Sequence, residues 1–473
     1  MLLRRFYDEA LAQASYLIGC QATGDAIVID ANRNAEQYEK VAREEGVRIT
    51  QVTETHIHAD YLSGSRELAR RNSAQLLLSG EGGTDWQYRF AHDDGATLLH
   101  DGDELQVGNI RLRVMHTPGH TPEHIVFVVT DTAGANEPMG MVSGDFIFVG
   151  DVGRPDLLER AARQAGTMEA AAGQLYESLQ KLGTLPDWLQ VWPGHGAGSA
   201  CGKALGAVPQ TTLGYERRFS GAFRAQEKGD FVRDILAGQP EPPRYFAVMK
   251  RMNRDGPPMR PAPIERTLYD LARLDAAEAS GAQLVDVRPA AEFAKAHIPG
   301  SLNIPLGRSF VGWAGALLDY DRSIILLASD IGPAYAARHQ LALIGMDNVD
   351  GVASATMILD AWSQAGRPVA TVASMDVSTL AEASKGHGPH VIDVRAATEW
   401  QDGHLPGATH MVLGELAELS SGLSRDEPIV VQCAGGGRSA IAASLLQSKG
   451  FTNVTNLAGG FTAWRKAGFP VER

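Results

Sequence analysis

The chain has 473 residues, roughly three times the ~150 that serve as a guide to one domain, so several domains are expected. Hydrophobic residues make up 44% and charged residues 21%, and the net charge of −13 argues against a nucleic-acid or anionic-membrane surface. No stretch approaches the ~20 uninterrupted apolar residues of a membrane-spanning helix, and acidic residues stand where a signal peptide has its apolar core. We therefore expect a cytoplasmic protein with no nucleic-acid and no membrane partner.

The first 237 residues mix short apolar strands with helical segments. Strands are predicted at residues 26–30, 48–55, 110–116 and 125–130. Antiparallel patterns dominate over strand–helix–strand alternation, which favours two sheets packed between helices. Residues 1–237 are therefore expected to form an αββα sandwich.

A proline-rich segment, residues 238–263, follows and holds seven of the 23 prolines. Proline fixes φ and removes a backbone donor, so regular structure is not expected in this segment. We predict that it is a semi-rigid linker.

The remaining residues contain an internal repeat. Val285-Asp-Val-Arg288 and His297-Ile-Pro-Gly300 match Ile392-Asp-Val-Arg395 and His404-Leu-Pro-Gly407 in the same spacing. Short apolar strands alternate with helical patterns in both copies, which indicates parallel sheets flanked by helices. Residues 264–371 and 372–473 are therefore predicted to be two copies of one α/β domain.

The second copy places a nucleophile between a strand and a helix, in the loop Cys433-Ala434-Gly435-Gly436-Gly437-Arg438-Ser439. This order aims backbone N–H groups and the positive end of the helix at one point, and the glycines let the backbone curl closely. The sulfur of Cys433 is stabilised there as the nucleophilic thiolate, and Arg438 adds positive charge. A phosphatase loop also combines Cys and Arg, but it has five residues between them. The four residues between Cys433 and Arg438 make a tighter ring, which suits a sulfur atom better.

The Cys433 loop resembles the rhodanese family, together with Asp393-Val-Arg395, His404-Leu-Pro-Gly407 and Gly459-Gly-Phe-Thr-Ala-Trp464. The resemblance implies that Cys433 carries sulfane sulfur as a persulfide, with Arg438 as a catalytic partner. It also implies that the other loop residues, Ala434, Gly435, Gly436, Gly437 and Ser439, bind the transferred sulfur.

The first copy contains no cysteine, and its matching turn spans residues 327–333. It therefore resembles an inactive rhodanese homology domain, for which we expect a spacer or docking role. Asp286 with Arg288, and Asp393 with Arg395, are predicted to be structural ion pairs at strand ends.

Four polar clusters in the front half each follow a predicted strand. They are Thr55-His56-Ile57-His58-Ala59-Asp60-Tyr61, Thr117-Pro-Gly-His120-Thr121, Ser143-Gly-Asp145 and Pro193-Gly-His195-Gly196. A sandwich gathers such strand-end side chains at one edge, and His and Asp are common metal ligands. The clusters therefore predict a metal site.

The same clusters resemble the metallo-β-lactamase superfamily, whose hydrolytic members carry His-x-His-x-Asp-His and bind two metals. Tyr61 replaces the final histidine here, which puts a two-metal centre in doubt. The pattern is similar to that of persulfide dioxygenases, which implies one Fe(II) held by His56, His120 and Asp145. Two His and one carboxylate suit non-haem iron and O₂ chemistry. The remaining polar residues of the clusters would orient these ligands, and they are His58, Asp60, Tyr61 and His195.

Two further residues are candidates beside the metal site. Arg154 is a candidate anchor for an anionic substrate, with an ordinary surface arginine as the alternative. Cys201 follows His195 by six residues. This segment resembles that of bacterial persulfide dioxygenase–rhodanese fusions, which carry a cysteine here. Cys201 is therefore a candidate persulfide acceptor, with Lys203 favouring its anion, and a packed thiol is the alternative.

The whole chain is similar, domain by domain, to bacterial persulfide dioxygenase–rhodanese fusions. The resemblance implies that a low-molecular-weight thiol persulfide is oxidised by O₂ to sulfite, and that Cys433 passes sulfane sulfur to sulfite to give thiosulfate, as sulfide detoxification requires. It also implies a homo-oligomer. The alternatives are a glyoxalase II-like thioester hydrolase fused to a sulfurtransferase, and a sulfur carrier or persulfide sensor.

Overall fold

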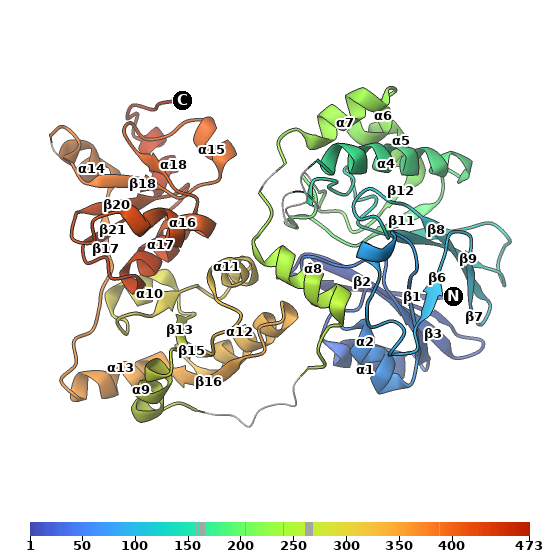
Figure 1. Cartoon of the computed structure of the whole chain (residues 1–473), viewed down its shortest axis with the longest axis horizontal. Helices are drawn as coiled ribbons and strands as arrows, with labels where there is room; N and C mark the ends of the chain where they lie inside the picture. The colour runs from blue at the N-terminus through green and yellow to red at the C-terminus, as the bar shows by residue number, and fades with distance from the viewer. Residues whose placement is uncertain (158, 160–165, 204, 240, 261–267, 387) are drawn as a thin grey trace. The chain divides into compact units, whose positions relative to one another are not determined.

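The structure is a computed structural model that describes every residue except 158, 160–165, 204, 240, 261–267 and 387 (Figure 1). The chain divides into two compact units, one formed by residues 1–261 and 342–345 and the other by residues 262–341 and 346–473. The predicted boundary between residues 263 and 264 lies outside the described residues. Among the helices that the structure describes, none is both long enough and apolar enough to cross a membrane.

The N-terminal unit contains two six-stranded sheets. The strands of the first sheet, in spatial order, are β1 (Leu2–Asp8), β2 (Gln13–Cys20), β3 (Asp25–Ile29), β4 (Arg48–Thr53), β5 (Gln75–Ser79) and β6 (Thr97–Leu99). Those of the second are β12 (Thr211–Thr212), β11 (Gln190–Pro193), β10 (Gly140–Gly144), β9 (Ile125–Asp131), β8 (Ile110–His116) and β7 (Glu104–Val107). The neighbours from β3 to β6, and the pair β10–β11, are parallel, so antiparallel pairing dominates only in the second sheet.

Side-chain alternation explains why these sheets form a four-layer sandwich. Successive residues of a strand point to opposite faces, so a strand buried on both faces is apolar throughout. In β3, Ile27 and Ile29 pack between the sheets, whereas Val28 packs on the outer face. The outer layers are α1 (Ala35–Glu44) and α2 (Ser65–Asn72) on the first sheet, and α4 (Met168–Lys181), α5 (Leu213–Phe219), α6 (Gly221–Arg224) and α7 (Lys228–Leu236) on the second (Figure 1).

The proline-rich segment contains a helix, which corrects the prediction that it lacks regular structure. α8 (Tyr245–Asp255) has eleven residues and lies in the stretch between the two proline pairs. Its Tyr245, Phe246 and Met249 are buried. Tertiary burial of this apolar face outweighs the effect of the flanking prolines, which restrict only the residues next to them.

The C-terminal unit holds two parallel sheets, as the repeat predicts. The first, in spatial order, is β14 (Leu302–Asn303), β13 (Gln283–Asp286), β15 (Ile324–Ala328) and β16 (Val349–Ser354). The second is β17 (Ala373–Met375), β21 (Val454–Leu457), β20 (Ile429–Gln432), β18 (His390–Asp393) and β19 (Thr409–His410). The αββα sandwich followed by two α/β domains with parallel sheets is confirmed.

Helices surround each parallel sheet. Those of the first copy are α9 (Leu271–Ala279), α10 (Ala290–Lys295), α11 (Phe310–Leu317), α12 (Ile331–Leu343) and α13 (Ala355–Gln364). Those of the second are α14 (Val377–Ala383), α15 (Ala397–Gln401), α16 (Leu416–Leu419), α17 (Gly437–Ser448) and α18 (Gly460–Lys466). The two copies meet at α17, where Ser444 accepts a hydrogen bond of 3.0 Å from the backbone N–H of Asn303 on β14.

The predicted ion pairs at the strand ends are present in both copies. The Arg288 guanidinium donates to both carboxylate oxygens of Asp286, and Arg395 does the same to Asp393. All four side chains are buried, so each charge is compensated by its partner.

The sandwich core makes a stability prediction. Phe127 on β9 is fully buried between the sheets, so Phe127→Ala is expected to lower the free energy of unfolding by about 3–5 kcal/mol through lost burial and a cavity. Denaturant unfolding of the full chain measures the change. The matched control is Phe219→Ala, whose side chain is 61% exposed, and equal effects of the two changes would contradict the layer assignment.

Candidate functional site

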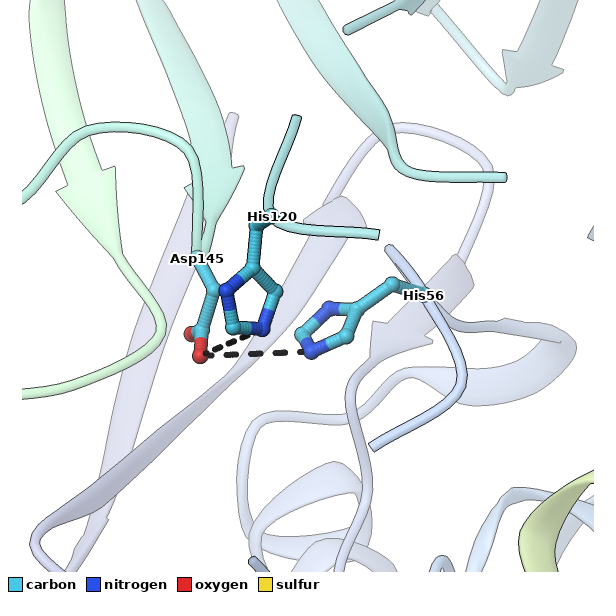
Figure 2. Close-up of side chains that lie close together, drawn as sticks. All are labelled: His56, His120 and Asp145. Atoms are coloured by element: carbon cyan, nitrogen blue, oxygen red, sulfur yellow. Dashed lines mark ion pairs between the residues drawn. The ribbon is translucent and has the colours of Figure 1, made fainter. Parts of the chain in front are cut away.

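Three strand ends converge on one buried cluster of ligand atoms. His56 follows β4, His120 follows β8 and Asp145 follows β10, and Figure 2 shows the three side chains pointing toward one another. Nε2 of His56 lies 3.9 Å and Nε2 of His120 lies 3.4 Å from Oδ2 of Asp145. The sequence-predicted metal ligands are thus brought together.

The donor atoms of this cluster are held in place but not consumed by hydrogen bonds. Nδ1 of His56 contacts the Thr55 hydroxyl at 2.9 Å, and Nδ1 of His120 contacts the Arg154 carbonyl at 3.1 Å. Within the described residues, Nε2 of His56 and both carboxylate oxygens of Asp145 have no hydrogen-bond partner. Buried polar atoms rarely lack a hydrogen-bond partner, and a metal ion would supply the missing partner here. The residues present therefore fit a metal.

Burial also sets the protonation of the two histidines. It holds the pKa of His56 well below its usual range, helped by the neighbouring His58, and it lowers the pKa of His120. Both imidazoles are therefore neutral near pH 7, which is the form that binds metal.

Asp30 supports the cluster, although the sequence patterns did not single it out. Its carboxylate accepts hydrogen bonds from the backbone N–H and the hydroxyl of Thr55 and contacts Nε2 of His58 at 3.1 Å. Burial lowers the pKa of His58, but the charge and hydrogen bond of Asp30 outweigh it and raise the value to about 9. The φ of Asp30 is +59°, a left-handed conformation that few non-glycine residues adopt.

Two further side chains, those of Tyr61 and His124, lie beside the cluster. The Tyr61 hydroxyl donates to the backbone carbonyl of Asp30 at 3.1 Å, so it is directed at the protein backbone. His124, another residue missed from the sequence, accepts the backbone N–H of Asp145 at Nε2 and stacks on the ring of His56. The sequence feature that could have identified His124 is its position four residues after His120.

A second group of ligand atoms lies on the other side of Asp145. Nε2 of His195 is 3.4 Å from Oδ1 of Asp145 and 3.2 Å from Oδ2 of Asp60. Cys201 joins Asp60 and His195 in a cluster whose ligand atoms all lie within 4.8 Å of one another. Burial and the charges of Asp60 and Asp145 raise the pKa of the Cys201 thiol well above its usual value.

The predicted help of Lys203 to a Cys201 anion is not seen. The Lys203 ammonium donates to the Ala237 carbonyl. The Cys201 segment is instead fixed by Ser199, whose hydroxyl accepts the Cys201 backbone N–H at 3.1 Å.

Arg154 is fully buried, so the surface alternative is wrong. Its guanidinium donates to both carboxylate oxygens of Asp156 and to the carbonyl of Ala200. Arg154 therefore ties the His120 region to the Cys201 segment, while its role as a substrate anchor stays a prediction.

The thiolate site lies in the C-terminal unit, between β20 and α17. The sulfur of Cys433 accepts the backbone N–H of Gly436 at 3.1 Å and the hydroxyl of Ser439 at 3.4 Å. Burial raises the pKa of Cys433, but these donors and the backbone N–H groups of Ser439 and Gly435 together lower it below its usual value. No hydrogen bond to this sulfur from the two other loop residues predicted to bind sulfur, Ala434 and Gly437, is described.

The positive charge of Arg438 is paired with a carboxylate. Its guanidinium donates to both carboxylate oxygens of Glu399, at 2.6 and 2.7 Å. The sequence predicted a positive charge at Arg438, and the structure shows that this charge is paired with a carboxylate from α15.

The N-terminal residues of α18 contact the backbone of the Cys433 loop. The N–H of Phe461 donates to the Cys433 carbonyl at 2.8 Å, and a Cβ at Gly460 would lie 2.1 Å from the same oxygen. In the first copy, strand register places Ala328 where the second has Cys433, since Asp286 pairs with Leu327 and Asp393 with Gln432. No thiol is present at that position.

Comparison with known proteins agrees with this architecture. The Metallo-beta-lactamase superfamily matches residues 8–195, and the Rhodanese-like domain matches residues 270–355 and 376–467. A crystallised metallo-beta-lactamase from Staphylococcus aureus subsp. aureus COL is 43% identical, with a TM-score of 0.69, over 74% of this chain and 98% of that chain.

Two curated relatives each match about two fifths of the chain. The mitochondrial persulfide dioxygenase of Bos taurus is 28% identical over 200 residues, which are 41% of this chain and 68% of the relative. A hydroxyacylglutathione hydrolase of Rhodospirillum rubrum is 30% identical over 181 residues, which are 38% of this chain and 60% of the relative.

These features define an αββα domain with a candidate metal site, joined to two rhodanese-like domains. The chain belongs to the metallo-beta-lactamase superfamily, and it carries two rhodanese-like domains behind the domain of that superfamily. Family and geometry together imply a metal at the cluster of His56, His120 and Asp145.

The first site prediction concerns metal content. Asp145→Ala is expected to reduce bound metal from about one equivalent to less than about a tenth, because removing even a ligand-orienting group typically costs 10–100-fold in affinity. Metal analysis after gel filtration measures it. His100→Ala is the matched control, since the His100 side chain is 58% exposed, and retention of metal by the Asp145 variant would contradict the assignment.

The second prediction concerns the thiolate. The ultraviolet thiolate absorbance that is lost in Cys433→Ser should titrate with a midpoint below that of an ordinary cysteine, because hydrogen bonds to the sulfur favour the anion. Ser439→Ala should move the midpoint upward, whereas Ser448→Ala on the same helix should not. An unchanged titration midpoint in Ser439→Ala would contradict the assignment of the Ser439 hydroxyl as a donor to the Cys433 sulfur.

Proposed function

We propose that the chain oxidises the sulfane sulfur of a low-molecular-weight thiol persulfide to sulfite with O₂, and that Cys433 then transfers sulfane sulfur to sulfite to give thiosulfate. The observation that carries the proposal is the ligand set of His56, His120 and Asp145, with the Tyr61 hydroxyl engaged by the Asp30 carbonyl. The bovine relative is a persulfide dioxygenase, and the rhodanese-like domains supply the second activity.

A mononuclear Fe(II) is the proposed metal, because two imidazoles and one carboxylate leave open positions that suit non-haem iron and O₂. When bound, iron supplies the activation of O₂ that oxidation of sulfur requires. The balanced reaction is RSSH + O₂ + H₂O → RSH + SO₃²⁻ + 2H⁺.

Residues of this chain orient the metal ligands and exclude water from the site. The Thr55 hydroxyl and the Arg154 carbonyl fix the rings of His56 and His120. The buried Phe146 and Phe148 belong to the same region, since Phe146 lies against His124 and Phe148 against His195. Such apolar walls limit hydrolysis and leakage of reactive sulfur species.

Sulfur transfer uses the Cys433 cradle in two balanced steps. The Cys433 thiolate attacks the outer sulfur of RSSH, the S–S bond breaks, and RS⁻ takes the proton to leave as RSH. Sulfite then attacks the outer sulfur of the Cys433 persulfide anion, which forms thiosulfate and returns the thiolate. The N–H of Gly436 and the hydroxyl of Ser439 stabilise the anion at the start and end of this cycle.

The role of Cys201, the domain boundaries and the role of the middle copy are further proposals. Cys201, beside Asp60 and His195, is the proposed acceptor of sulfur near the metal. The domains are proposed to span residues 1–237, 264–371 and 372–473, with the inactive middle copy supporting α17 through the Asn303–Ser444 hydrogen bond.

A thioester hydrolase of the glyoxalase II type is the second candidate. It is favoured by the second cluster of Asp60 and His195 and by the similarity to a hydroxyacylglutathione hydrolase. The experiment that separates the two supplies glutathione persulfide and a glutathione thioester to iron-loaded protein. Persulfide-dependent O₂ uptake supports the dioxygenase, whereas thioester cleavage without O₂ uptake would overturn it.

The division of labour between the sites gives a prediction. Cys433→Ser is expected to retain O₂ uptake but to release sulfite in place of thiosulfate, because oxidation needs the metal cluster and transfer needs the thiolate. Ion chromatography of the sulfur products measures this. Cys20→Ser is the matched control and should still yield thiosulfate, and persistent thiosulfate in the Cys433 variant would contradict the assignment.

A further inference from the structure

We infer that Asn253 on α8 is a positioning residue for the metal cluster, because its side-chain amide fixes the backbone that follows the ligand His56. The helix α8 lies outside residues 8–195, which the superfamily matches, but inside the same compact unit. The inference needs a metal at the cluster of His56, His120 and Asp145, but it does not need the proposed oxidation of a persulfide.

The backbone that carries His56 depends on tertiary contacts for its shape. Residues 54–62, all of which the structure describes, lie between β4 and α2 and form neither strand nor helix. Their side chains at His56, His58 and Tyr61 are buried. Buried backbone groups that lack the hydrogen bonds of regular structure need other partners, and those partners then determine the conformation.

The Asn253 side chain supplies three such partners. Its Nδ2 donates to the backbone carbonyls of His58 at 2.7 Å and Tyr61 at 2.8 Å, and its Oδ1 accepts the backbone N–H of Ser63 at 2.9 Å. A carboxamide offers two donor hydrogens and an acceptor oxygen, so each of its groups is engaged by this one segment. Asn253 is 1% exposed, and water therefore competes little for these hydrogen bonds.

The buried face of α8 holds the amide in place. Phe246 and Met249 are buried and precede Asn253 by seven and four residues, which is the spacing of one helix face. The Lys250 ammonium lies 3.4 Å from the centre of the Trp86 ring, a cation–π contact that fixes the helix from a second side. The amide is thus presented by a packed element.

The segment is held on both sides of His58. The carboxylate of Glu123 accepts the backbone N–H of Ile57 at 2.8 Å, directly after the ligand His56. Asn253 holds the chain from His58 onward. Without the amide, the buried carbonyls and the N–H lose their partners, and the backbone must rearrange to find others. Such a rearrangement moves His56 relative to the two ligands that lie on other strands.

The test compares Asn253→Ala with Met249→Ala in the full chain. Met249 is buried on the same helix face, so its truncation loosens the packing of α8 but leaves the amide present. Fe²⁺ is titrated anaerobically against a competing chelator, under conditions in which circular dichroism shows both variants to be folded. Asn253→Ala should bind Fe²⁺ at least about tenfold more weakly than the wild type, as expected for a group that orients metal ligands. Met249→Ala and the exposed-site control Arg251→Ala should bind Fe²⁺ as the wild type does.

Hydrogen exchange of the metal-free chain, followed by mass spectrometry, gives a second measurement. A peptide that covers residues 54–64 should exchange faster in Asn253→Ala than in the wild type, whereas peptides from β8 and β9 should not change. Asn253→Asp has nearly the same shape and retains the acceptor for Ser63 but lacks both donors, so it should weaken Fe²⁺ binding as well. This variant serves as the test if Asn253→Ala does not fold.

Three results would overturn the proposal. They are unchanged Fe²⁺ affinity in both Asn253 variants, an equal loss of affinity in Asn253→Ala and Met249→Ala, and faster exchange spread equally over β8 and β9. A wild-type chain that binds no Fe²⁺ would overturn the role of Asn253 together with the metal assignment. A chain that binds Fe²⁺ but oxidises no persulfide would contradict the proposed function and leave the role of Asn253 supported by the affinities.

Discussion

The buried carboxylate of Asp145 is the constraint around which the N-terminal unit is organised. Its Oδ2 faces His56 and His120, and its Oδ1 faces His195, while its backbone N–H is held by His124. Glycine also lies where the chain crosses the backbone of Asp145. A Cβ at Gly153 would lie 1.8 Å from the Asp145 carbonyl oxygen, so that crossing admits no larger residue.

Two cysteines of this chain show how surroundings decide the chemistry of one side chain. Cys433 is buried, but backbone N–H groups and a hydroxyl point at its sulfur, and its pKa falls. Cys201 is buried against Asp60 and Asp145, and its pKa rises. The first is suited to act as a nucleophile, whereas burial and two neighbouring carboxylates favour the neutral thiol of the second.

The sequence predicted the parts of the structure that local spacing determines. The αββα sandwich and the parallel repeats followed from strand patterns, and the convergence of His56, His120 and Asp145 followed from their positions after strands. Asp30 and Glu399 were missed because their partners, Thr55 and Arg438, are 25 and 39 residues away. The helix α8 was missed because its burial depends on tertiary packing that proline counts do not report.

The account depends on one redox metal lying on the His56 side of Asp145. Anomalous diffraction at the iron edge, on crystals of the anaerobically iron-loaded full chain, tests this most directly. The account predicts one iron peak between His56, His120 and Asp145 Oδ2, with no iron at Asp60 and His195. Two iron peaks of equal height on both sides of Asp145 would contradict it and favour a two-metal hydrolytic centre.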